Sequence, residues 1–126
     1  MSKKKILIID DEKNFTEVVG INLEATGEYE VKMETDPNNA LPAARQFRPD
    51  LILLDVIMGK KEGPDVAIEF KNDPLLERIP IVFLTATVTQ KEVDDEGGMI
   101  GGHSFVAKPS SLETLLYVIE DNLRFA

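Results

Sequence analysis

Five short apolar runs, separated by stretches with helical spacing, are the feature that most restricts how this chain can fold. The runs are "KILII" (5–9), "YEVKMET" (29–35), "LILL" (51–54), "IPIVFLTA" (79–86) and "SFVA" (104–107). The second run alternates polar and apolar residues, which suits a strand nearer an edge of the sheet. Their length and their β-branched residues favour strands over helices. Strands that alternate with helices form a parallel sheet with helices on both faces, so we expect a doubly wound α/β fold.

The stretches between the runs carry apolar residues at helical spacing. We expect helices between Phe15 and Gly27, Pro37 and Phe47, Pro64 and Asn72, Thr89 and Gly102, and Ser110 and Leu123. Pro42 interrupts the second helix, and four glycines weaken the fourth. Ser110 and Glu113 have the spacing of a capping box at the start of the last helix.

Length and composition limit the class of protein. The chain has 126 residues, enough for one domain (1–126), and its net charge of −9 argues against binding to nucleic acid or an anionic membrane. It has no cysteine and only one histidine, His103, which excludes thiolate and multi-histidine metal sites. The apolar run Ile6–Ile9 is too short for a signal peptide or a membrane span, so we expect a cytoplasmic protein.

Charged and polar residues follow four of the five predicted strands. Asp10 and Asp11 follow the first, Asp55 the third, Thr85 ends the fourth and Lys108 follows the fifth. Each residue alone has a structural explanation, such as a helix cap, a turn, a strand end or a solvated lysine. Because the carboxyl ends of parallel strands meet at one edge, where such sheets bind ligands, the combination is more specific than its members.

The expected cluster suits phosphoryl chemistry. Three carboxylates close together repel one another unless a cation is present, and an all-oxygen ligand set favours Mg²⁺. Lys108 adds a second cation beside a transferring phosphoryl group. An aspartate can itself be the nucleophile, which gives an aspartyl phosphate.

The segments "ILIIDDEKN", "PDLILLDVIM", "IPIVFLTA" and "FVAKPSSLETL" resemble the signature segments of response-regulator receiver domains. The resemblance covers nearly the whole chain. It implies a flavodoxin-like, doubly wound, five-stranded parallel sheet of order 2-1-3-4-5 with five helices.

The resemblance also implies a metal site. Asp55 corresponds to the phosphoacceptor and Asp11 to the main acid that binds Mg²⁺. Asp10 supports the metal directly or through water. The backbone carbonyl of Ile57 corresponds to the third protein ligand.

The phosphoryl oxygens and the switch are assigned in the same way. Thr85 and Lys108 correspond to the residues that hold the phosphoryl oxygens, with help from the backbone N–H groups of Val56 and Ala86. Thr85 and Phe105 correspond to the hydroxyl and the aromatic ring that move on activation.

The implied partners are a phosphohistidine donor, on a sensor histidine kinase or a phosphotransfer protein, and a downstream output protein or domain. The output surface would be formed by the fourth helix, the fifth strand and the fifth helix. We expect a monomer or a weak, phosphorylation-dependent dimer with no direct contact to nucleic acid or membrane. Such a domain speeds its own phosphorylation and dephosphorylation and turns over no separate substrate.

Two other functions compete with this interpretation. A Mg²⁺-dependent phosphatase with an aspartate nucleophile usually has two aspartates as D-x-D after one strand, whereas Asp10 and Asp11 are adjacent. An unphosphorylated interaction module would not need Asp11, Asp55, Thr85 and Lys108 together. A nucleotide-binding protein lacks support, because the chain has no glycine-rich phosphate loop.

The chain departs from the family pattern near the acceptor. Gly59 replaces the usual proline, which predicts a more mobile loop, and Lys60 and Lys61 add positive charge. Ile57 has an apolar side chain that cannot orient an attacking water, so we expect slow self-dephosphorylation. His103 is expected to be a surface histidine rather than a phosphorylated one.

Overall fold

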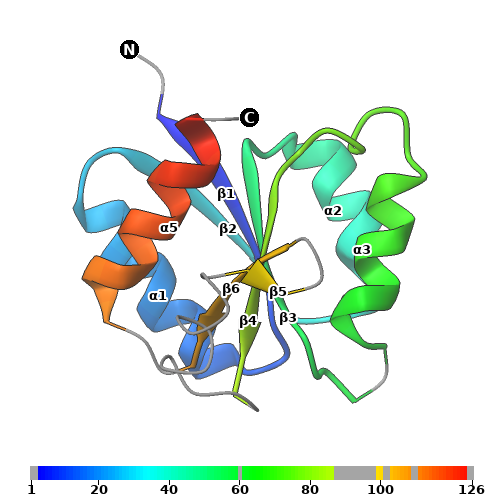
Figure 1. The fold of residues 1–126 in the computed structure, drawn as a ribbon, viewed down its shortest axis with the longest axis horizontal. Helices are drawn as coiled ribbons and strands as arrows, with labels where there is room; N and C mark the ends of the chain where they lie inside the picture. The colour runs from blue at the N-terminus through cyan, green and yellow to red at the C-terminus, as the bar shows by residue number, and fades with distance from the viewer. Residues whose placement is uncertain (1–2, 60, 87–98, 101–102, 109–110, 125–126) are drawn as a thin grey trace.

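The computed structural model describes residues 3–59, 61–86, 99–100, 103–108 and 111–124. At its centre is a sheet with five parallel strands (Figure 1), namely β1 Lys4–Ile9, β2 Tyr29–Glu34, β3 Leu51–Asp55, β4 Ile81–Thr85 and β6 His103–Ala107. These strands lie in the order β2-β1-β3-β4-β6. The predicted order of the parallel strands, 2-1-3-4-5, is therefore confirmed, and the alternating run 29–35 forms an edge strand.

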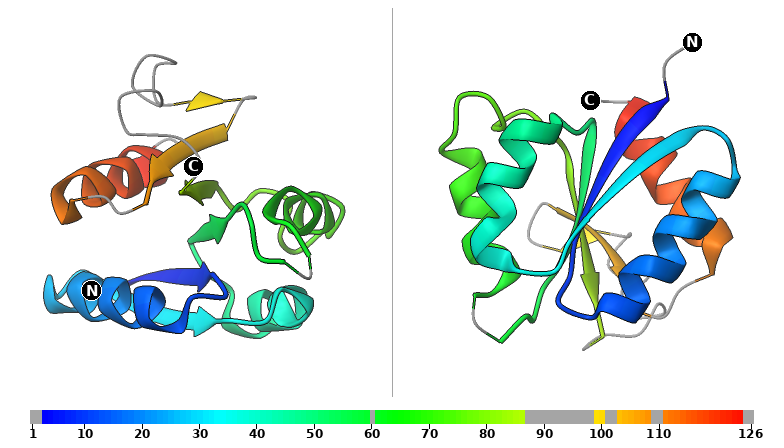
Figure 2. Two further views of the ribbon diagram at one scale, coloured as in Figure 1. Left: turned by 90° about the horizontal axis from the view of Figure 1, so that it is seen from below. Right: turned by 180° about the vertical axis from the view of Figure 1, so that it is seen from behind.

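The described residues contain four α-helices, namely α1 Lys13–Ala25, α2 Ala40–Phe47, α3 Gly63–Lys71 and α5 Leu112–Arg124. A short 3₁₀ helix, Pro37–Asn39, leads into α2. Helices α1 and α5 cover one face of the sheet, and α2 and α3 cover the other (Figures 1 and 2). This three-layer arrangement is the doubly wound fold that the alternation of runs and helices predicts.

Both faces of the sheet are buried, which explains why each central strand contains a continuous apolar run of four residues. In β1, Leu7 and Ile9 belong to the core beneath α2 and α3, whereas Ile6 and Ile8 belong to the core beneath α1 and α5. Successive side chains of a strand point to opposite faces, so a strand covered on both sides needs a continuous apolar run. All five residues of β3 are buried for this reason, including Asp55 at its end.

An additional strand is the main difference from the prediction. β5, Met99–Ile100, pairs antiparallel with β6 at the edge of the sheet. A helix was expected between Thr89 and Gly102, so the prediction is wrong for these two residues. The rest of that segment, residues 87–98 and 101–102, lies outside the described part of the chain. Glycine lowers helix propensity on both sides of the pair.

Two helix starts also differ in detail. Pro42 lies in the first turn of α2, where the missing N–H is tolerated, so it does not interrupt the helix. The N–H of Thr114 donates to Ser111 Oγ at 3.1 Å, which makes Ser111 the capping residue of α5. The expected pairing of Ser110 with Glu113 is thus displaced by one residue, and Ser110 itself lies outside the described residues.

A side-chain bridge joins the two helices of one face. Arg45 of α2 donates to Asp73, which follows α3, at 2.7 Å from Nε and 2.6 Å from Nη2. The N–H of Leu75 and the Arg45 guanidinium lower the pKa of Asp73, so its carboxylate stays charged. The bridge fixes α2 against the turn that leads into β4.

Among the described residues, no helix has the length and apolar composition that crossing a membrane requires.

Candidate phosphoryl and metal site

The candidate site lies at the carboxyl ends of the parallel strands, at the bottom of the sheet in Figure 1. Asp55 is the last residue of β3 and Thr85 the last of β4, while Asp10 and Lys108 directly follow β1 and β6. The register aligns these ends, since Asp55 pairs with Leu84 and Thr85 with Ala107. The last residues of these strands are buried and paired with their neighbours, so they hold the side chains at the strand ends in fixed positions.

Three carboxylates meet at this edge, as predicted. Asp10, Asp11 and Asp55 each offer one oxygen, and these oxygens all lie within 4.8 Å of one another. Asp10 and Asp55 are buried, and Asp11 is exposed. The N–H of Glu12 donates to Asp10 Oδ1 at 2.9 Å, which fixes the Asp10 carboxylate. The cluster thus combines two rigid acids with one that solvent can reach.

Lys108 brings a cation into the cluster. Its Nζ lies 2.8 Å from Asp10 Oδ2, 2.8 Å from Glu12 Oε1 and 3.6 Å from Asp55 Oδ1. The backbone N–H of Lys108 donates to the carbonyl of Thr85 at 2.7 Å, so β4 helps to position the residue. Burial alone would lower the pKa of Lys108, but the hydrogen bonds to Asp10 and Glu12 outweigh it and raise the pKa. The ammonium is therefore charged at neutral pH.

The surroundings of Asp55 favour its protonated form. Burial raises its pKa most, the charges of Asp10 and Asp11 raise it further, and Lys108 partly offsets them, which leaves a pKa of about 7. An acid with this pKa is ionised in only about half of the molecules at neutral pH. A cation bound between the three acids would lower the pKa and complete ionisation.

The three acids fit Mg²⁺. All their donor atoms are carboxylate oxygens, their spacing of at most 4.8 Å is short enough for one ion, and their mutual repulsion is what a divalent cation relieves. Asp10, Asp11 and Asp55 would therefore hold the ion. The carbonyl of Ile57 stays a predicted ligand; its side chain is exposed.

The predicted phosphoryl-binding and switch residues lie around this cluster. Thr85 is buried at the end of β4, and Ala86 follows it as an exposed residue. Phe105 of β6 is half-buried and stacks on Phe83, with ring centroids 5.1 Å apart. The N–H of Val56 donates to the carbonyl of Leu84 at 3.0 Å. The β3–β4 hydrogen bonds thus continue one residue past Asp55, and the role of this N–H toward a phosphoryl oxygen stays a prediction.

An apolar cavity of about 580 Å³ lies beside Phe105, the predicted switch residue. Its walls come from α3, β4 and β6 and include Val56, Ile68, Phe83, His103 and Phe105. His103 packs edge-on against Phe83 at 5.1 Å. The half-buried histidine thus belongs to an aromatic wall beneath α3, partly covered rather than a free surface residue.

The loop after Asp55 contacts the start and the body of α3. Gly59 has a φ of +81°, a conformation that proline cannot adopt, and its N–H donates to Glu62 Oε1 at 3.2 Å. Lys61 forms an ion pair with Glu69 of α3. The charge of Lys61 is therefore paired with an acid of α3. Lys60 lies outside the described residues.

Sequence analysis did not identify Glu12 as part of the site. Its carboxylate contacts Lys108, although 96 positions separate the two residues. Glu12 directly follows Asp10 and Asp11, and this acidic run was a signal that could have suggested it. The contact depends on the direction in which α1 begins, which residue spacing alone does not give.

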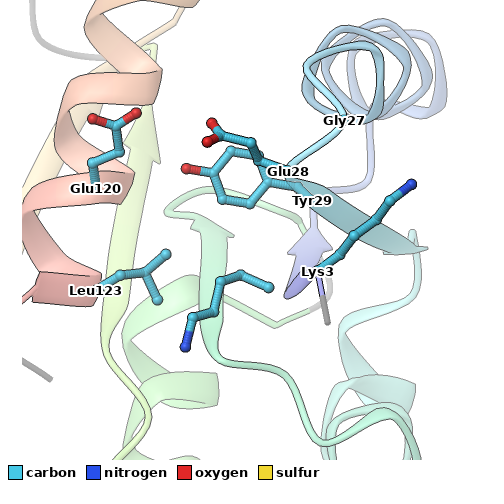
Figure 3. Close-up of a pocket in the computed structure, with 7 residues that line it drawn as sticks. Lys3, Gly27, Glu28, Tyr29, Glu120 and Leu123 are labelled. Atoms are coloured by element: carbon cyan, nitrogen blue, oxygen red, sulfur yellow. The ribbon is translucent and has the colours of Figure 1, made fainter. Parts of the chain in front are cut away.

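A second hollow, of about 410 Å³, lies at the opposite end of the sheet. Figure 3 shows Tyr29 at its centre, with Glu120 and Leu123 of α5 on one side and Lys3 on the other. Burial and the charges of Glu120 and Glu28 raise the pKa of Tyr29, so its hydroxyl stays protonated. The hollow contains none of the acids of the cluster and is separate from the candidate site.

Comparison with known proteins agrees with the fold. The sequence profile described as the response regulator receiver domain matches residues 6–120. The chemotaxis protein CheY4 of Vibrio cholerae is 28% identical, with a TM-score of 0.81 over 96% of this chain and 99% of that one. A protein from Chloroflexus aurantiacus described as a response regulator is 26% identical, with a TM-score of 0.82 over 98% of this chain and 99% of that one. The N-terminal domain of a response regulator receiver protein from Methanoculleus marisnigri is 30% identical, with a TM-score of 0.70 over 95% and 96% of the two chains. The chain therefore belongs to the response regulator receiver domain family.

Proposed function

We propose that this receiver domain accepts a phosphoryl group on Asp55 from a phosphohistidine of a sensor histidine kinase or a phosphotransfer protein. The observation that supports this most strongly is the position of Lys108 Nζ, 3.6 Å from Asp55 Oδ1, in the cluster that also holds Asp10 and Asp11. A carboxylate nucleophile beside an ammonium and two further acids suits phosphoryl transfer.

Transfer joins Asp55 to phosphorus. One carboxylate oxygen attacks the phosphorus, the new O–P bond forms as the P–N bond to the donor imidazole breaks, and the imidazole nitrogen keeps that electron pair. Lys108 stabilises the charge on the phosphoryl oxygens. Mg²⁺ bound by Asp10, Asp11 and Asp55 would offset their charge and polarise the phosphoryl group. The domain turns over no separate substrate in this proposal.

The phosphoryl group would change the surface through Thr85 and Phe105. We assign a phosphoryl oxygen to the Thr85 hydroxyl and to the N–H of Ala86, and a metal contact to the carbonyl of Ile57. Phe105 stacks on Phe83 beside the apolar cavity, so a movement of its ring would alter that surface. The output partner would bind the side of the molecule formed by β6 and α5, together with the segment that precedes β6.

Incubation with acetyl phosphate and Mg²⁺, followed by intact mass measurement, tests the proposal. The wild type should gain the mass of one phosphoryl group in a form that hydroxylamine removes. Asp55→Asn should gain nothing, whereas Asp65→Asn, which changes an exposed acid of α3, should behave like the wild type. No adduct on the wild type, under conditions where Mg²⁺ binding is measured, would contradict the proposal and favour an unphosphorylated interaction module.

A further inference from the structure

The carboxylate of Glu12 contacts Lys108 rather than the first turn of α1, although Glu12 is the N-cap residue of that helix. Glu12 is the N-cap residue of α1, where a side chain commonly accepts a hydrogen bond from the first turn of the helix, yet its carboxylate makes no such bond. Instead, Glu12 Oε1 lies 2.8 Å from Lys108 Nζ. The helix therefore begins without a side-chain cap while this acid contacts the cation of the site.

The backbone of Glu12 is held on both sides. Its N–H donates to Asp10 Oδ1 at 2.9 Å, and its carbonyl accepts from the N–H of Thr16 at 3.1 Å. The side chain thus leaves from a fixed point at the mouth of the site, where it is 63% exposed. Phe15, one turn further along α1, presents its ring 4.5 Å from Lys108 Nζ.

These contacts hold the Lys108 ammonium closer to Asp10 and Glu12 than to Asp55, with which it forms a longer ion pair. Its distance to Asp10 and Glu12 is 2.8 Å, a full hydrogen bond, but its distance to Asp55 Oδ1 is 3.6 Å. An ammonium has three hydrogens, and two of them are used by acids other than Asp55. Glu12 is not among the acids that would hold the metal, so a bound ion would not draw its carboxylate away from Lys108.

We propose that Glu12 is a positioning residue that restrains Lys108 beside α1, so that phosphoryl transfer to Asp55 requires the Glu12–Lys108 contact to loosen. The inference rests on the proposed function, because it concerns the rate of that transfer. Glu12 contacts neither Asp55 nor the phosphoryl group and acts only through the position of the ammonium.

Two substitutions separate the contact from the charge. Glu12→Gln removes the charge and keeps the length, so its amide oxygen can accept only a weaker hydrogen bond from Lys108. Glu12→Asp keeps the charge, but its shorter side chain cannot reach Lys108 and suits capping of α1. Glu17→Gln is the matched control, because it removes an equal charge from α1 at a residue that pairs with Lys13 rather than with Lys108.

The first measurement follows the contact itself. The ammonium resonance of Lys108, identified by its loss in Lys108→Arg, should be observable in nitrogen-labelled wild type because the side chain is only 6% exposed. Its hydrogens should exchange faster in both Glu12 variants and at the wild-type rate in Glu17→Gln. Unchanged exchange in both Glu12 variants would overturn the restraint.

The second measurement is the rate of Asp55 phosphorylation by acetyl phosphate at saturating Mg²⁺. Both Glu12 variants should react roughly two- to fivefold faster, the effect expected of a partly exposed ion pair, and Glu17→Gln should match the wild type. A faster rate in Glu12→Gln alone would show a charge effect and overturn the proposal, as would a slower rate in either variant. A wild type that takes up no phosphoryl group would contradict the proposed function, whereas unchanged rates in a wild type that reacts would contradict the role of Glu12 alone.

Discussion

Asp55 is buried beside two other acids, and its charge state would control binding of the proposed Mg²⁺. Its pKa of about 7 means that Mg²⁺ must displace a proton from it below that pH. We predict that Mg²⁺ affinity rises by up to about tenfold per pH unit below about pH 7 and levels off above it. Calorimetry in buffers of different ionisation heat should detect the released proton. Affinity that is flat across this range would contradict the prediction, and Asp55→Asn should lose the dependence.

Ile57 places an apolar, 54% exposed side chain near the acceptor. It offers no polar atom to orient a water molecule for attack on the aspartyl phosphate. We predict that Ile57→Asn, whose amide can orient water, shortens the phosphoryl half-life by up to about tenfold, measured as the decay of the intact-mass adduct. Ile57→Leu keeps an apolar side chain and should decay at the wild-type rate. A half-life in Ile57→Asn that is unchanged or longer would show that water orientation at this position does not control the lifetime.

The residues of the site differ in how far they could be predicted. Asp10, Asp55 and Lys108 follow buried apolar runs, so their positions follow from strand ends that share one edge. Glu12 was missed because its contact depends on the side-chain direction at the N-cap of α1. The hydrogen bond from the N–H of Val56 to the carbonyl of Leu84 was not predicted, because apolar runs do not reveal how the hydrogen bonds of neighbouring strands are aligned.

Gly63, the first residue of α3, allows the acceptor strand and this helix to approach closely. A Cβ at this position would clash with the carbonyl oxygen of Asp55 and lie 3.0 Å from Val56 Cα. We predict that Gly63→Ala lowers the free energy of unfolding by about 1–3 kcal/mol and weakens Mg²⁺ binding, because the backbone of Asp55 must shift. Urea unfolding and calorimetry measure the two effects.

Gly20 of α1 provides the control for this substitution. A Cβ there would lie 3.4 Å from Val31 Cγ1, an ordinary contact, and alanine has the higher helix propensity. Gly20→Ala should therefore leave stability unchanged or raise it, with unchanged Mg²⁺ binding. A Gly63→Ala variant as stable as Gly20→Ala would contradict the close approach.

The elements could be predicted to the extent that their patterns were strong. The sequence runs predicted all five parallel strands, because a strand buried on both faces is a continuous apolar run and an edge strand such as β2 alternates polar and apolar residues. The strand β5, Met99–Ile100, was missed because two residues between glycines carry no periodic pattern. The cap of α5 was displaced by one residue because Ser110 and Ser111 are both suitable caps, and only the backbone distinguishes them.

At the scale of the whole molecule, the topology could be predicted only by combining two kinds of information. Alternating strands and helices predicted a parallel sheet covered on both faces, and the structure has α1 and α5 on one face and α2 and α3 on the other. The strand order came from the resemblance to receiver domains, since periodicity does not distinguish between orders that right-handed crossovers permit. That order brings Asp10, which follows β1, and Asp55 of β3 to neighbouring strand ends.

The cluster also makes the stability of the whole protein depend on pH. The pKa of Asp55 is about 7 in the folded protein and near 3.8 in an unfolded chain, so between these values the folded state binds more protons. Its contribution to the free energy of unfolding therefore falls as the pH rises from about 4 to about 7 and is constant above that range. The variant Asp55→Asn does not lose stability in this way, because asparagine does not ionise.

Without metal, we predict that Asp55→Asn and the wild type differ little in stability near pH 4 and that Asp55→Asn is more stable above pH 7, by on the order of a few kcal/mol. With Mg²⁺ above pH 7, the wild type should be the more stable of the two, because the ion stabilises it more than the variant that has lost one ligand. Urea unfolding of both proteins across this range, with and without Mg²⁺, measures the difference, and a difference that does not change with pH would show that Asp55 ionises in the folded protein as it does in the unfolded chain.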